Sequence, residues 1–347
     1  MSTDTPINHL VEMIPIIVLN WNGEDDTLEC LRSIKQSVPA GFLPVVVDNG
    51  SSLVSLERLK QGCDEIFGRV VYLRETDLRC HSESQRDQIK ASLSDDSLVF
   101  IENCANFGFA KGSNVGIRFA EIIGSEWVML LNNDTIVARN AFQELRRFVT
   151  AHPAYLAITP QIRHYSPATR IQNCGGTLTY FGSQKYRFWN EDVSALPQAD
   201  FSVVTFITGC ALLFNYKVAG PLTEDFFFGE EDYEFSLRMK KLGLGMACVH
   251  RAVVHHKLGA SISKTSKPLG AILVYYENRL INTRNYYSEL RWQTTKLLAY
   301  LYLPVLFVKR GIALKNAIWA IKRVECYIRK HKTVPQAEFQ SLVVYNR

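Results

Sequence analysis

Apolar runs and amphipathic stretches alternate through the first part of the chain. Residues 13–20 form a short apolar run, and residues 25–37 follow with leucine and isoleucine at helical spacing. A second apolar run, residues 42–50, ends in residues that favour turns. This order of strand, helix and strand predicts a parallel sheet with crossover helices.

The same alternation continues toward the middle of the chain. We expect an α/β fold with a mostly parallel central sheet flanked by helices. The polar segment 74–97 interrupts the pattern, and we interpret it as an insertion with partial helix or disorder. Further strands are predicted at 69–75, 98–103, 127–134 and 156–162, and further helices at 113–123 and 138–150.

The segment 222–243 places six carboxylates within eleven positions and three phenylalanines between them. Helix physics explains part of this pattern, because the acids at 230–232 suit the positive end of a helix and Gly243 suits its termination. On these grounds a well-capped helix and a functional site remain alternatives of similar weight. The buried stripe of the helix is expected to comprise Phe235, Met239 and Leu242.

Polar side chains follow three of the predicted strands at their carboxyl ends. In an open α/β sheet, ligands bind beyond this edge. One such acid is usually a turn former, but three groups on one rim favour a binding site. The groups are Asn20, Trp21 and Asn22; Asp48, Asn49 and Gly50; and Asn132, Asn133 and Asp134.

A row of glycines, Gly108, Gly112 and Gly116, leads into a predicted helix. Glycine lets a backbone approach a ligand closely, and a helix start offers free N–H groups to an anion. The row matches neither the dinucleotide fingerprint nor the phosphate-loop motif. These two common nucleotide-binding folds are therefore disfavoured.

Composition and cysteine spacing limit the class of protein. The 347 residues, 47% of them apolar, suffice for two average domains or for one large domain with an appendage. The eight cysteines show no CxxC pair and no metal-binding spacing, which indicates reduced thiols and a cytoplasmic location. Residues 1–13 lack the basic and apolar regions of a secretory signal.

Basic charge is concentrated near the C-terminus, where the span 284–332 holds eleven Lys or Arg and two acids. Residues 297–308 are apolar, but these twelve residues are fewer than the roughly 20 needed to span a bilayer. Together with the basic stretch that follows, the segment 297–323 resembles helices that lie peripherally on an anionic membrane surface. The alternative is a helical pair packed on the main domain or on a second copy in a homodimer. No nucleic-acid-binding motif accompanies the charge, so no nucleic-acid partner is expected.

Six motifs, in order, resemble glycosyltransferase family 2, which has the GT-A fold. They are IIVLNWNGEDDTLECLRSI, VVVDNGSS, NFGFAKGSNVGI, WVMLLNND, FFFGEEDYEFSLRMKKLG and VVHHKLGAS. Within this family, the sequence most resembles a bacterial branch described as rhamnosyltransferase-like, whose members build cell-surface polysaccharides. The resemblance covers about residues 13–285, so we expect a GT-A domain over 1–290 and a helical extension over 291–347.

This resemblance implies an inverting, metal-dependent hexosyltransferase. Such an enzyme moves a sugar from a nucleotide-sugar donor to a hydroxyl of a glycan or lipid-linked acceptor. The alternatives are a catalytically silent sugar- or nucleotide-binding relative and a sugar-nucleotide nucleotidyltransferase. The silent relative is disfavoured because both Asp134 and Asp232 are present, and the nucleotidyltransferase because its basic, glycine-rich first loop is absent.

The family motifs also imply roles for the residues that bind the donor. Asp48 matches an acid that hydrogen-bonds the nucleotide base, and Leu19 and Asn20 would flank that base. Gly112 and Asn114 match positions close to the nucleotide.

A second set of matches concerns the metal. Asp134 matches the last acid of a motif that holds Mg²⁺ or Mn²⁺ against the two phosphates. Asn132 stands where the family has the first acid of that motif, and Asn133 lies between Asn132 and Asp134. The resemblance implies that both asparagines contribute to binding of the nucleotide sugar. His256 matches a histidine that joins the metal or the phosphates, and the neighbouring His255 is the alternative.

Asp232 matches the general base that takes the proton from the acceptor hydroxyl. Phenylalanines 226–228 would restrict water around it and raise its pKa. Glu231 would orient an acceptor hydroxyl or cap the helix, while Thr208 and Gly209 would line the sugar and acceptor pocket. Arg279 has two equal alternatives, a contact with phosphate and a surface ion pair.

Overall fold

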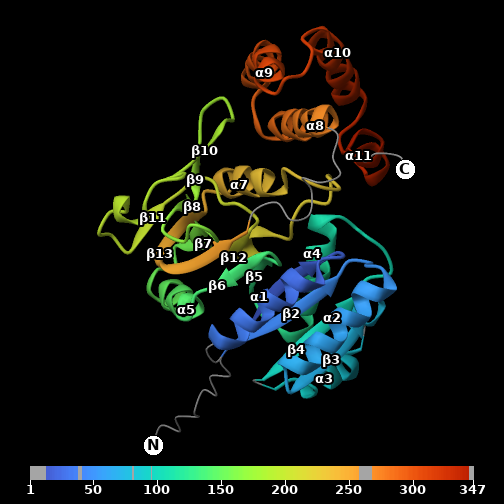
Figure 1. Cartoon of the computed structure of the whole chain (residues 1–347), viewed down its shortest axis with the longest axis vertical. Helices are drawn as coiled ribbons and strands as arrows, with labels where there is room; N and C mark the ends of the chain where they lie inside the picture. Colours follow the sequence, from blue (N-terminus) through green and yellow to red (C-terminus); the bar gives the residue numbers. More distant parts are fainter. Residues whose placement is uncertain (1–12, 38–40, 80–81, 95, 258–267, 344–347) are drawn as a thin grey trace, which may run out of the picture.

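The computed structural model describes residues 13–37, 41–79, 82–94, 96–257 and 268–343. The N-terminal segment examined for a secretory signal lies almost wholly outside these ranges, as does the end of the VVHHKLGAS motif. Within them, one eleven-stranded sheet organises the fold (Figure 1). Its main path is β11 (Phe201–Val203), β13 (Gly245–His256), β7 (Tyr155–His164), β12 (Ala211–Asn215), β5 (Trp127–Asn132), β1 (Ile14–Asn20), β2 (Phe42–Asp48), β4 (Ser97–Glu102) and β3 (Arg69–Arg74).

The sheet is parallel on one side and mixed on the other. From β5 to β3 every neighbouring pair is parallel, as the sequence predicted. Strand β12 is antiparallel to both β5 and β7, and β7 and β13 run parallel to each other. Two short strands extend this half, β6 (Thr135–Val137) on β13 and β8 (Ile171–Asn173) on β7. The α/β class is therefore confirmed. Its consecutive parallel strands, β5, β1, β2, β4 and β3, all come from the first 132 residues of the chain.

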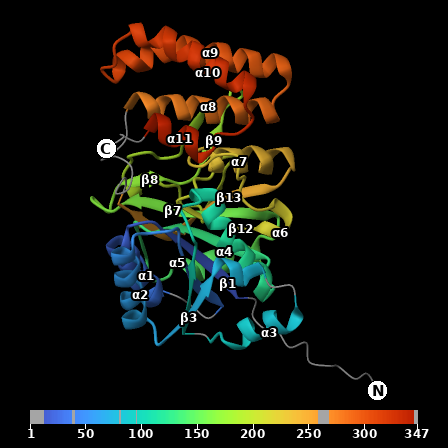
Figure 2. The same ribbon diagram turned by 90° about the vertical axis from the view of Figure 1, so that its right-hand side faces the viewer.

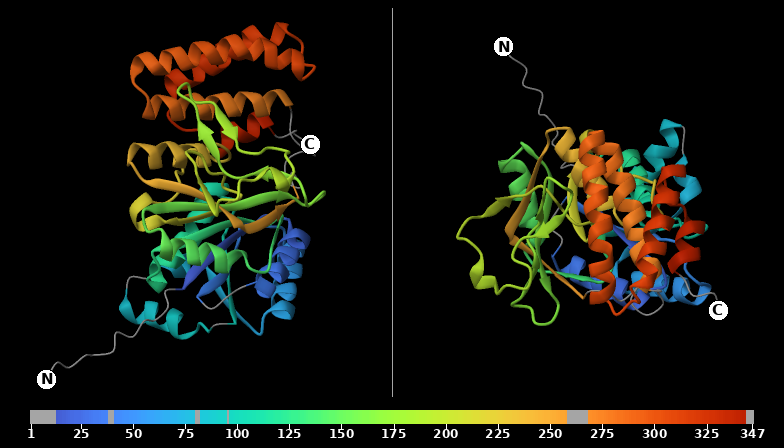
Figure 3. Two further views of the ribbon diagram at one scale, coloured as in Figure 1. Left: turned by 90° about the vertical axis from the view of Figure 1, so that its left-hand side faces the viewer. Right: turned by 90° about the horizontal axis from the view of Figure 1, so that it is seen from above.

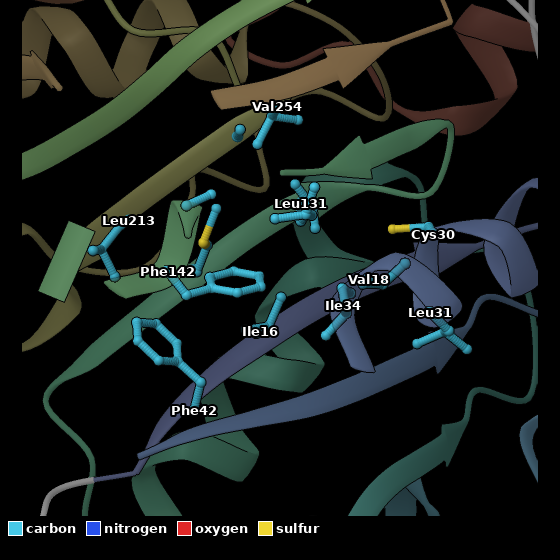
Figure 4. Packing of buried hydrophobic residues seen from close by; sticks show 14 of the residues in the cluster. Ile16, Val18, Cys30, Leu31, Ile34, Phe42, Leu131, Phe142, Leu213 and Val254 are labelled. Atoms are coloured by element: carbon cyan, nitrogen blue, oxygen red, sulfur yellow. The ribbon is translucent and has the colours of Figure 1, made fainter. Parts of the chain in front are cut away.

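Helices cover both faces of the sheet, which explains why its central strands are apolar on both sides. The first face carries α1 (Glu24–Ser37), α2 (Leu53–Ile66) and α5 (Ala141–Ala151), whose apolar residues pack with Ile16 and Val18 of β1 (Figure 4). The other face carries α4 (Phe109–Ile123) and α7 (Glu231–Lys241), which pack with Ile17. The alternation along β1 thus splits the core into two layers.

Helix α2 was missed in the sequence analysis. Ser52 caps it by accepting a hydrogen bond from the Ser55 backbone, and Leu59 and Cys63 are fully buried at helical spacing. These signals were present in the sequence. The polar segment 74–97 contains a 3-10 helix, Glu75–Arg79, and α3 (Glu83–Ala91).

The glycine row brings α4 against its neighbours. A Cβ on Gly108, whose φ is +82°, would lie 2.0 Å from the carbonyl oxygen of Phe227. A Cβ on Gly112 would lie 2.8 Å from Leu19, and one on Gly116 would lie 2.7 Å from Ile17. The row therefore provides close packing of α4 on β1 and on the loop that precedes α7.

Helix α7 ends near the predicted place, with Gly243 in the left-handed conformation at φ +70°. Phe235 and Met239 are fully buried, as expected. The prediction for Leu242 was wrong, because its side chain is 53% exposed. Leu242 follows Lys241, the last residue of the helix, and so lies beyond the part of α7 that faces the sheet.

The C-terminal helices form their own layers on one side of the sheet domain. They are α8 (Pro268–Tyr286), α9 (Glu289–Lys309), α10 (Lys315–Lys330) and α11 (Gln336–Val343). Helix α8 packs on α7, and α9 and α10 lie side by side as an outer layer on α8 (Figures 2 and 3). Phe226 joins their hydrophobic core, so the loop before α7 is anchored in it. Across the described ranges, no helix is both long and apolar enough to cross a bilayer.

Candidate functional site

Asn20 and Asp48 end the neighbouring strands β1 and β2, and both are completely buried. Asn20 Nδ2 donates to Asp48 Oδ1 at 2.8 Å, and the backbone N–H of Ser51 donates to Asp48 Oδ2 at 3.0 Å. Thr27 Oγ1 donates to Asn20 Oδ1 at 2.8 Å. This network fixes the rim at the ends of β1 and β2. The contacts predicted between a nucleotide base and Leu19, Asn20 and Asp48 stay predictions.

Asn114 has a different set of partners from the one suggested by the sequence. Its Nδ2 donates to the Leu222 carbonyl at 2.9 Å and to Glu224 Oε1 at 3.0 Å, and its Oδ1 accepts from the Leu222 backbone N–H at 3.0 Å. Both amide hydrogens are thus donated to the segment that leads into α7. The predicted position of Asn114 close to a nucleotide remains untested, like that of Gly112.

The Asn132, Asn133 and Asp134 group lies where β5 turns into β6. Asn133 Nδ2 donates to Thr27 Oγ1 at 3.0 Å, which joins this turn to the network at Asn20. Asn132 is half-buried, and its backbone N–H donates to the Cys210 carbonyl at 2.8 Å. Asp134 is 7% exposed. All three polar groups predicted on this rim therefore belong to one hydrogen-bonded network, which runs through Asn20 and Thr27.

His256, and not His255, faces Asp134, while its role as a ligand of the metal or the phosphates stays a prediction. Its Nε2 lies 3.1 Å from Asp134 Oδ1, and its Nδ1 lies 2.9 Å from Oε1 of Gln172. His255 points to the opposite side of β13, because side chains alternate along a strand. Gln172 was missed in the sequence analysis, since nothing in its short strand marks it as a partner of residue 256.

The Asp134 and His256 pair suits a divalent cation. When Gln172 Oε1 accepts the Nδ1 hydrogen, the Nε2 lone pair faces a carboxylate oxygen, and a cation or a proton must lie between them. Burial lowers the pKa of His256, but the Cys210 and Asp134 side chains outweigh it and raise this pKa to about 10. Among the described residues, no three His, Cys, Asp or Glu side chains form a metal-binding group. Phosphate and water oxygens are common further ligands of such a cation.

Glu231 and Asp232 open helix α7, with Glu230 before them in the left-handed conformation at φ +70°. The backbone N–H of Gly209 lies 3.4 Å from Asp232 Oδ2, so the loop with Thr208 and Gly209 adjoins this carboxylate. Glu231 is buried, and its Oε2 has no hydrogen-bond partner. Such an atom is costly unless a ligand donates to it.

Burial and neighbouring acids shift the titration of both carboxylates. Burial is the main cause of the raised pKa of Asp232, and the Glu230 carboxylate adds to it, while Gly209 and Arg279 act in the opposite direction. The pKa of Glu231 is raised by burial and then by the Asp232 carboxylate. A carboxylate with a raised pKa is a stronger base near neutral pH.

The phenylalanines that precede this site have a packing function. Phe226 is 2% exposed in the core of the C-terminal helices, and Phe227 and Phe228 both pack against Phe339 of α11. They fix the loop between Leu222 and α7 to the helical layer. The pKa of Asp232 is raised, which is the predicted direction, and burial is the first cause of this shift.

Helix α8 holds the loop that carries the acids. Asn278 Nδ2 donates to the carbonyls of Phe228 and Gly229 at 3.1 and 2.9 Å. Asn282 Nδ2 donates to the Glu230 carbonyl at 3.0 Å, and Arg279 pairs with both carboxylate oxygens of Glu230. These side chains form a clamp, defined here as Asn278, Arg279 and Asn282.

Arg279 is therefore neither a surface residue nor free to reach a phosphate. It is 6% exposed, it donates to Gly182 and Gln184, and its guanidinium lies 3.6 Å from the centre of the Tyr233 ring. The expected ion pair exists, but it is buried. A signal for the clamp was available in the buried polar run at 277–279 and 282, which interrupts an otherwise apolar helix.

Comparisons with known proteins bear on the whole arrangement. A family model described as "Glycosyltransferase like family 2" matches residues 12–271. The low-salt glycan biosynthesis hexosyltransferase Agl10 of Haloferax volcanii is 22% identical over 319 residues, which cover 87% of this chain and 87% of the relative.

Solved structures with low sequence identity share the fold. GalNAc-T7 with UDP, GalNAc and Mn²⁺ is 13% identical with a TM-score of 0.56; the match covers 96% of this chain and 57% of that one. The mannosyltransferase PcManGT of Pyrobaculum calidifontis, with GDP-Man and Mn²⁺, is 14% identical with a TM-score of 0.50 and coverages of 90% and 73%. S. aureus TarS residues 1–349 in complex with UDP is 13% identical with a TM-score of 0.50, and the match covers 90% of this chain and 82% of that one. These matches confirm the GT-A fold expected from the motifs.

Proposed function

The chain belongs to the glycosyltransferase-like family 2, and from this premise we propose that it is an inverting hexosyltransferase. It moves a hexose from a nucleotide-sugar donor to a hydroxyl of a glycan or lipid-linked acceptor in cell-surface polysaccharide synthesis. The observation that carries this proposal is the Asp232 carboxylate, which has a raised pKa and lies beside the Gly209 loop. The rhamnosyltransferase-like branch stays a prediction.

Asp232 acts as the general base in the proposed reaction. Its carboxylate accepts the proton of the acceptor hydroxyl while that oxygen bonds to the anomeric carbon. The bond between the anomeric carbon and the diphosphate oxygen breaks, and the nucleoside diphosphate leaves with the electron pair. Because the oxygen attacks from the face opposite the leaving group, the anomeric configuration inverts. Glu231 Oε2, buried without a partner, accepts a hydrogen bond from the acceptor and orients it.

Asp134 and His256 would hold a divalent cation, with Gln172 fixing the ring of His256. When bound, the cation neutralises the charge on the donor diphosphate. An imidazole ligand favours Mn²⁺ over Mg²⁺, because Mg²⁺ prefers oxygen ligands. Two similar structures contain Mn²⁺, which supports this assignment, and structures with UDP and GDP-Man support a nucleoside-diphosphate sugar as donor.

Thermal unfolding with nucleotides tests the donor site. We expect one of UDP, dTDP and GDP to stabilise the protein, and Mn²⁺ to increase the gain, because a ligand at about 100 times its dissociation constant contributes roughly 2.7 kcal/mol. Asp134→Asn should remove the metal-dependent part of the gain. Exposed Asp200→Asn is the matched control and should behave as the wild type. No stabilisation by any nucleotide, with or without metal, would contradict the proposed function.

The two alternatives predict different products. A silent relative would bind a nucleotide sugar without transfer or hydrolysis, and a nucleotidyltransferase would form sugar nucleotides from a sugar phosphate and a nucleoside triphosphate. Release of nucleoside diphosphate that depends on Asp232 separates the proposed transferase from both.

We also propose that the outer layer, α9 and α10, lies on an anionic membrane surface at the cytoplasmic face. Its inner side packs through Trp292, Leu303 and Phe307, as the helical-pair alternative required. Its outer side nevertheless exposes apolar side chains, a pattern that favours an apolar partner. The exposed set is Leu290, Leu297, Leu298, Leu301, Val305 and Val308 of α9, and Ile318 and Trp319 of α10.

Exposed basic side chains accompany this surface at Lys309, Arg310, Lys315 and Lys322, which suits lipid headgroups. Arg323, the last residue of the segment 297–323 that was predicted to lie on the membrane, instead points inward and pairs with Glu277 and Glu338. The division into a GT-A domain, 1–290, and a helical extension, 291–347, remains a proposal. Helix α8, which carries the clamp, lies before residue 290 but packs with the C-terminal helices.

Vesicle flotation tests the membrane contact. We expect the protein to float with vesicles of phosphatidylcholine and phosphatidylserine and less with phosphatidylcholine alone. Leu301→Glu should abolish flotation, because the side chain is 64% exposed at the centre of the apolar surface. Leu53→Glu on α2, at a site 76% exposed, should have no effect. Dimers without flotation would show instead that this surface binds a second copy.

A further inference from the structure

The turn after β10 (Gln184–Tyr186) presents a tryptophan from a strained backbone. Trp189 is 52% exposed, and its neighbours Phe188 and Asn190 have φ values of +57° and +60°. A left-handed conformation is uncommon for non-glycine residues and especially for a bulky one such as phenylalanine. Such strain persists only where the surrounding structure imposes it, and it clusters at ligand-binding sites.

Backbone hydrogen bonds hold this turn on both sides. Asn190 N–H donates to the Ile171 carbonyl at 2.8 Å, and Ile171 N–H donates to the Glu191 carbonyl at 2.9 Å. On the other side Arg187 N–H donates to the Gly175 carbonyl at 3.0 Å. Phe188 packs against the core between the sheet and α4. The indole of Trp189 is therefore held in place before any ligand arrives.

Trp189 is linked through its neighbours to both parts of the candidate site. Its ring stacks on Tyr186 with centroids 5.7 Å apart, and it meets the edge of His164 at 5.9 Å. His164 is the register partner of His256 across β7 and β13. On the other side Gln184 donates to the Tyr186 hydroxyl at 3.3 Å and accepts from Arg279 of the clamp at 2.9 Å.

We propose that Trp189 and Tyr186 form a platform for a pyranose ring of the acceptor. One face of a pyranose carries only C–H groups, and these pack on the electron-rich face of an indole. The ring edges keep their hydroxyls free, so one can face Asp232 while the ring is stacked. This inference rests on the proposed transferase function and specifies its acceptor as a sugar, whether free or carried on a lipid.

The position of the platform favours the acceptor over the donor base. The base is expected at the ends of β1 and β2, and three strands, β12, β5 and β1, separate β7 from β2 in the sheet. The turn at Trp189 instead joins β8, at the edge where His256 and Gln172 lie. A sugar on the indole would approach the anomeric carbon from the side away from the nucleotide rim.

Saturation-transfer NMR with methyl pyranosides of glucose, galactose and mannose tests the platform directly, with a saturating nucleoside diphosphate present. We expect signals on the C–H face of at least one pyranoside in the wild type and in Trp189→Phe. Trp189→Ala should lose them, with acceptor binding weakened roughly three- to tenfold. Trp319→Ala on α10, 51% exposed, is the matched control and should keep them. Equal signals in wild type and Trp189→Ala would overturn the inference.

Kinetics separate this inference from the proposed function. With a soluble glycoside acceptor, Trp189→Ala should raise the KM for acceptor and leave the KM for donor and the hydrolysis of donor unchanged. An unchanged acceptor KM would refute the platform while the transferase stands. Wild-type protein that releases no nucleoside diphosphate would refute the transferase itself. Trp189→Phe, which keeps an aromatic face, should recover most of the acceptor affinity and shows that the alanine variant has not simply misfolded.

Discussion

Asp232→Asn is expected to lower sugar transfer by roughly 10²- to 10⁴-fold, the range attributed to general base catalysis. An amide is similar in size to a carboxylate and still accepts the hydrogen bond from Gly209, but it cannot take a proton at neutral pH. The donor affinity should remain that of the wild type, because the residues predicted to bind the nucleotide base, Leu19, Asn20 and Asp48, lie on β1 and β2. Transfer rates and nucleotide-dependent thermal stabilisation, measured on the same sample, check both parts.

The pH dependence of transfer gives a second measure of the same residue. Asp232 must be deprotonated to act, and its pKa is raised to about 6, so kcat/KM for acceptor should fall as the pH drops through about 6. An ordinary aspartate would keep its activity to about pH 4. The acid limb of the profile should vanish with Asp232→Asn, since the residual reaction no longer needs this base.

Glu224→Gln is the matched control for these measurements. Glu224 is an exposed acid of the same segment, and a glutamine can still accept the hydrogen bond from Asn114. Its activity and its pH profile should match the wild type. Wild-type turnover by Asp232→Asn, or an equal loss in Glu224→Gln, would contradict the assignment of Asp232 as the base.

Local patterns sufficed for the parallel half of the fold. Strands β1, β2 and β4 are apolar because both of their faces are covered, and their signal lies in consecutive residues. The acids at 230–232 likewise predicted the start of α7 from one short segment. The burial of Ile16, Ile17 and Val18 follows from the same local run.

Contacts between distant segments explain what the sequence could not predict. Gln172 meets His256 from 84 positions away, and Arg279 meets Glu230 from 49 positions away. Nothing in the residues near either partner specifies such a pairing. The first depends on the pairing of β8 and β13 with β7, and the second on how helix α8 docks beside α7. Arg323 shows the same effect, since its inward direction follows from Glu277, which α8 supplies.

The clamp on α8 lies within the predicted domain 1–290, and in the proposed mechanism it supports the loop that carries the base. Asn278 and Asn282 fix the backbone of residues 228–230, and Arg279 fixes the side chain of Glu230. Because Glu230 directly precedes the first turn of α7, its conformation sets the direction in which Asp232 leaves the helix. In the proposed mechanism, Arg279, Asn278 and Asn282 are therefore positioning residues for the base, Asp232.

Arg279→Met should therefore affect both stability and catalysis. It leaves the Glu230 carboxylate buried without its cation, which costs about 3–5 kcal/mol of unfolding free energy. The kcat should fall while the KM for donor stays constant. The acid limb of the pH profile should also move to higher pH, because Arg279 lowers the pKa of Asp232 and Glu230 raises it.

A double variant separates positioning from stability. Arg279→Met with Glu230→Gln removes both charges, so most of the lost unfolding free energy should return and the pH profile should move back. The kcat should stay low, because neither side chain then orients the loop. Arg251→Met breaks the exposed pair with Asp200, in which both side chains are 56% exposed, and should cost less than about 1 kcal/mol with no change in the pH profile. If the double variant regains full kcat, the loop is oriented by Asn278 and Asn282 alone, and Arg279 serves only to neutralise Glu230.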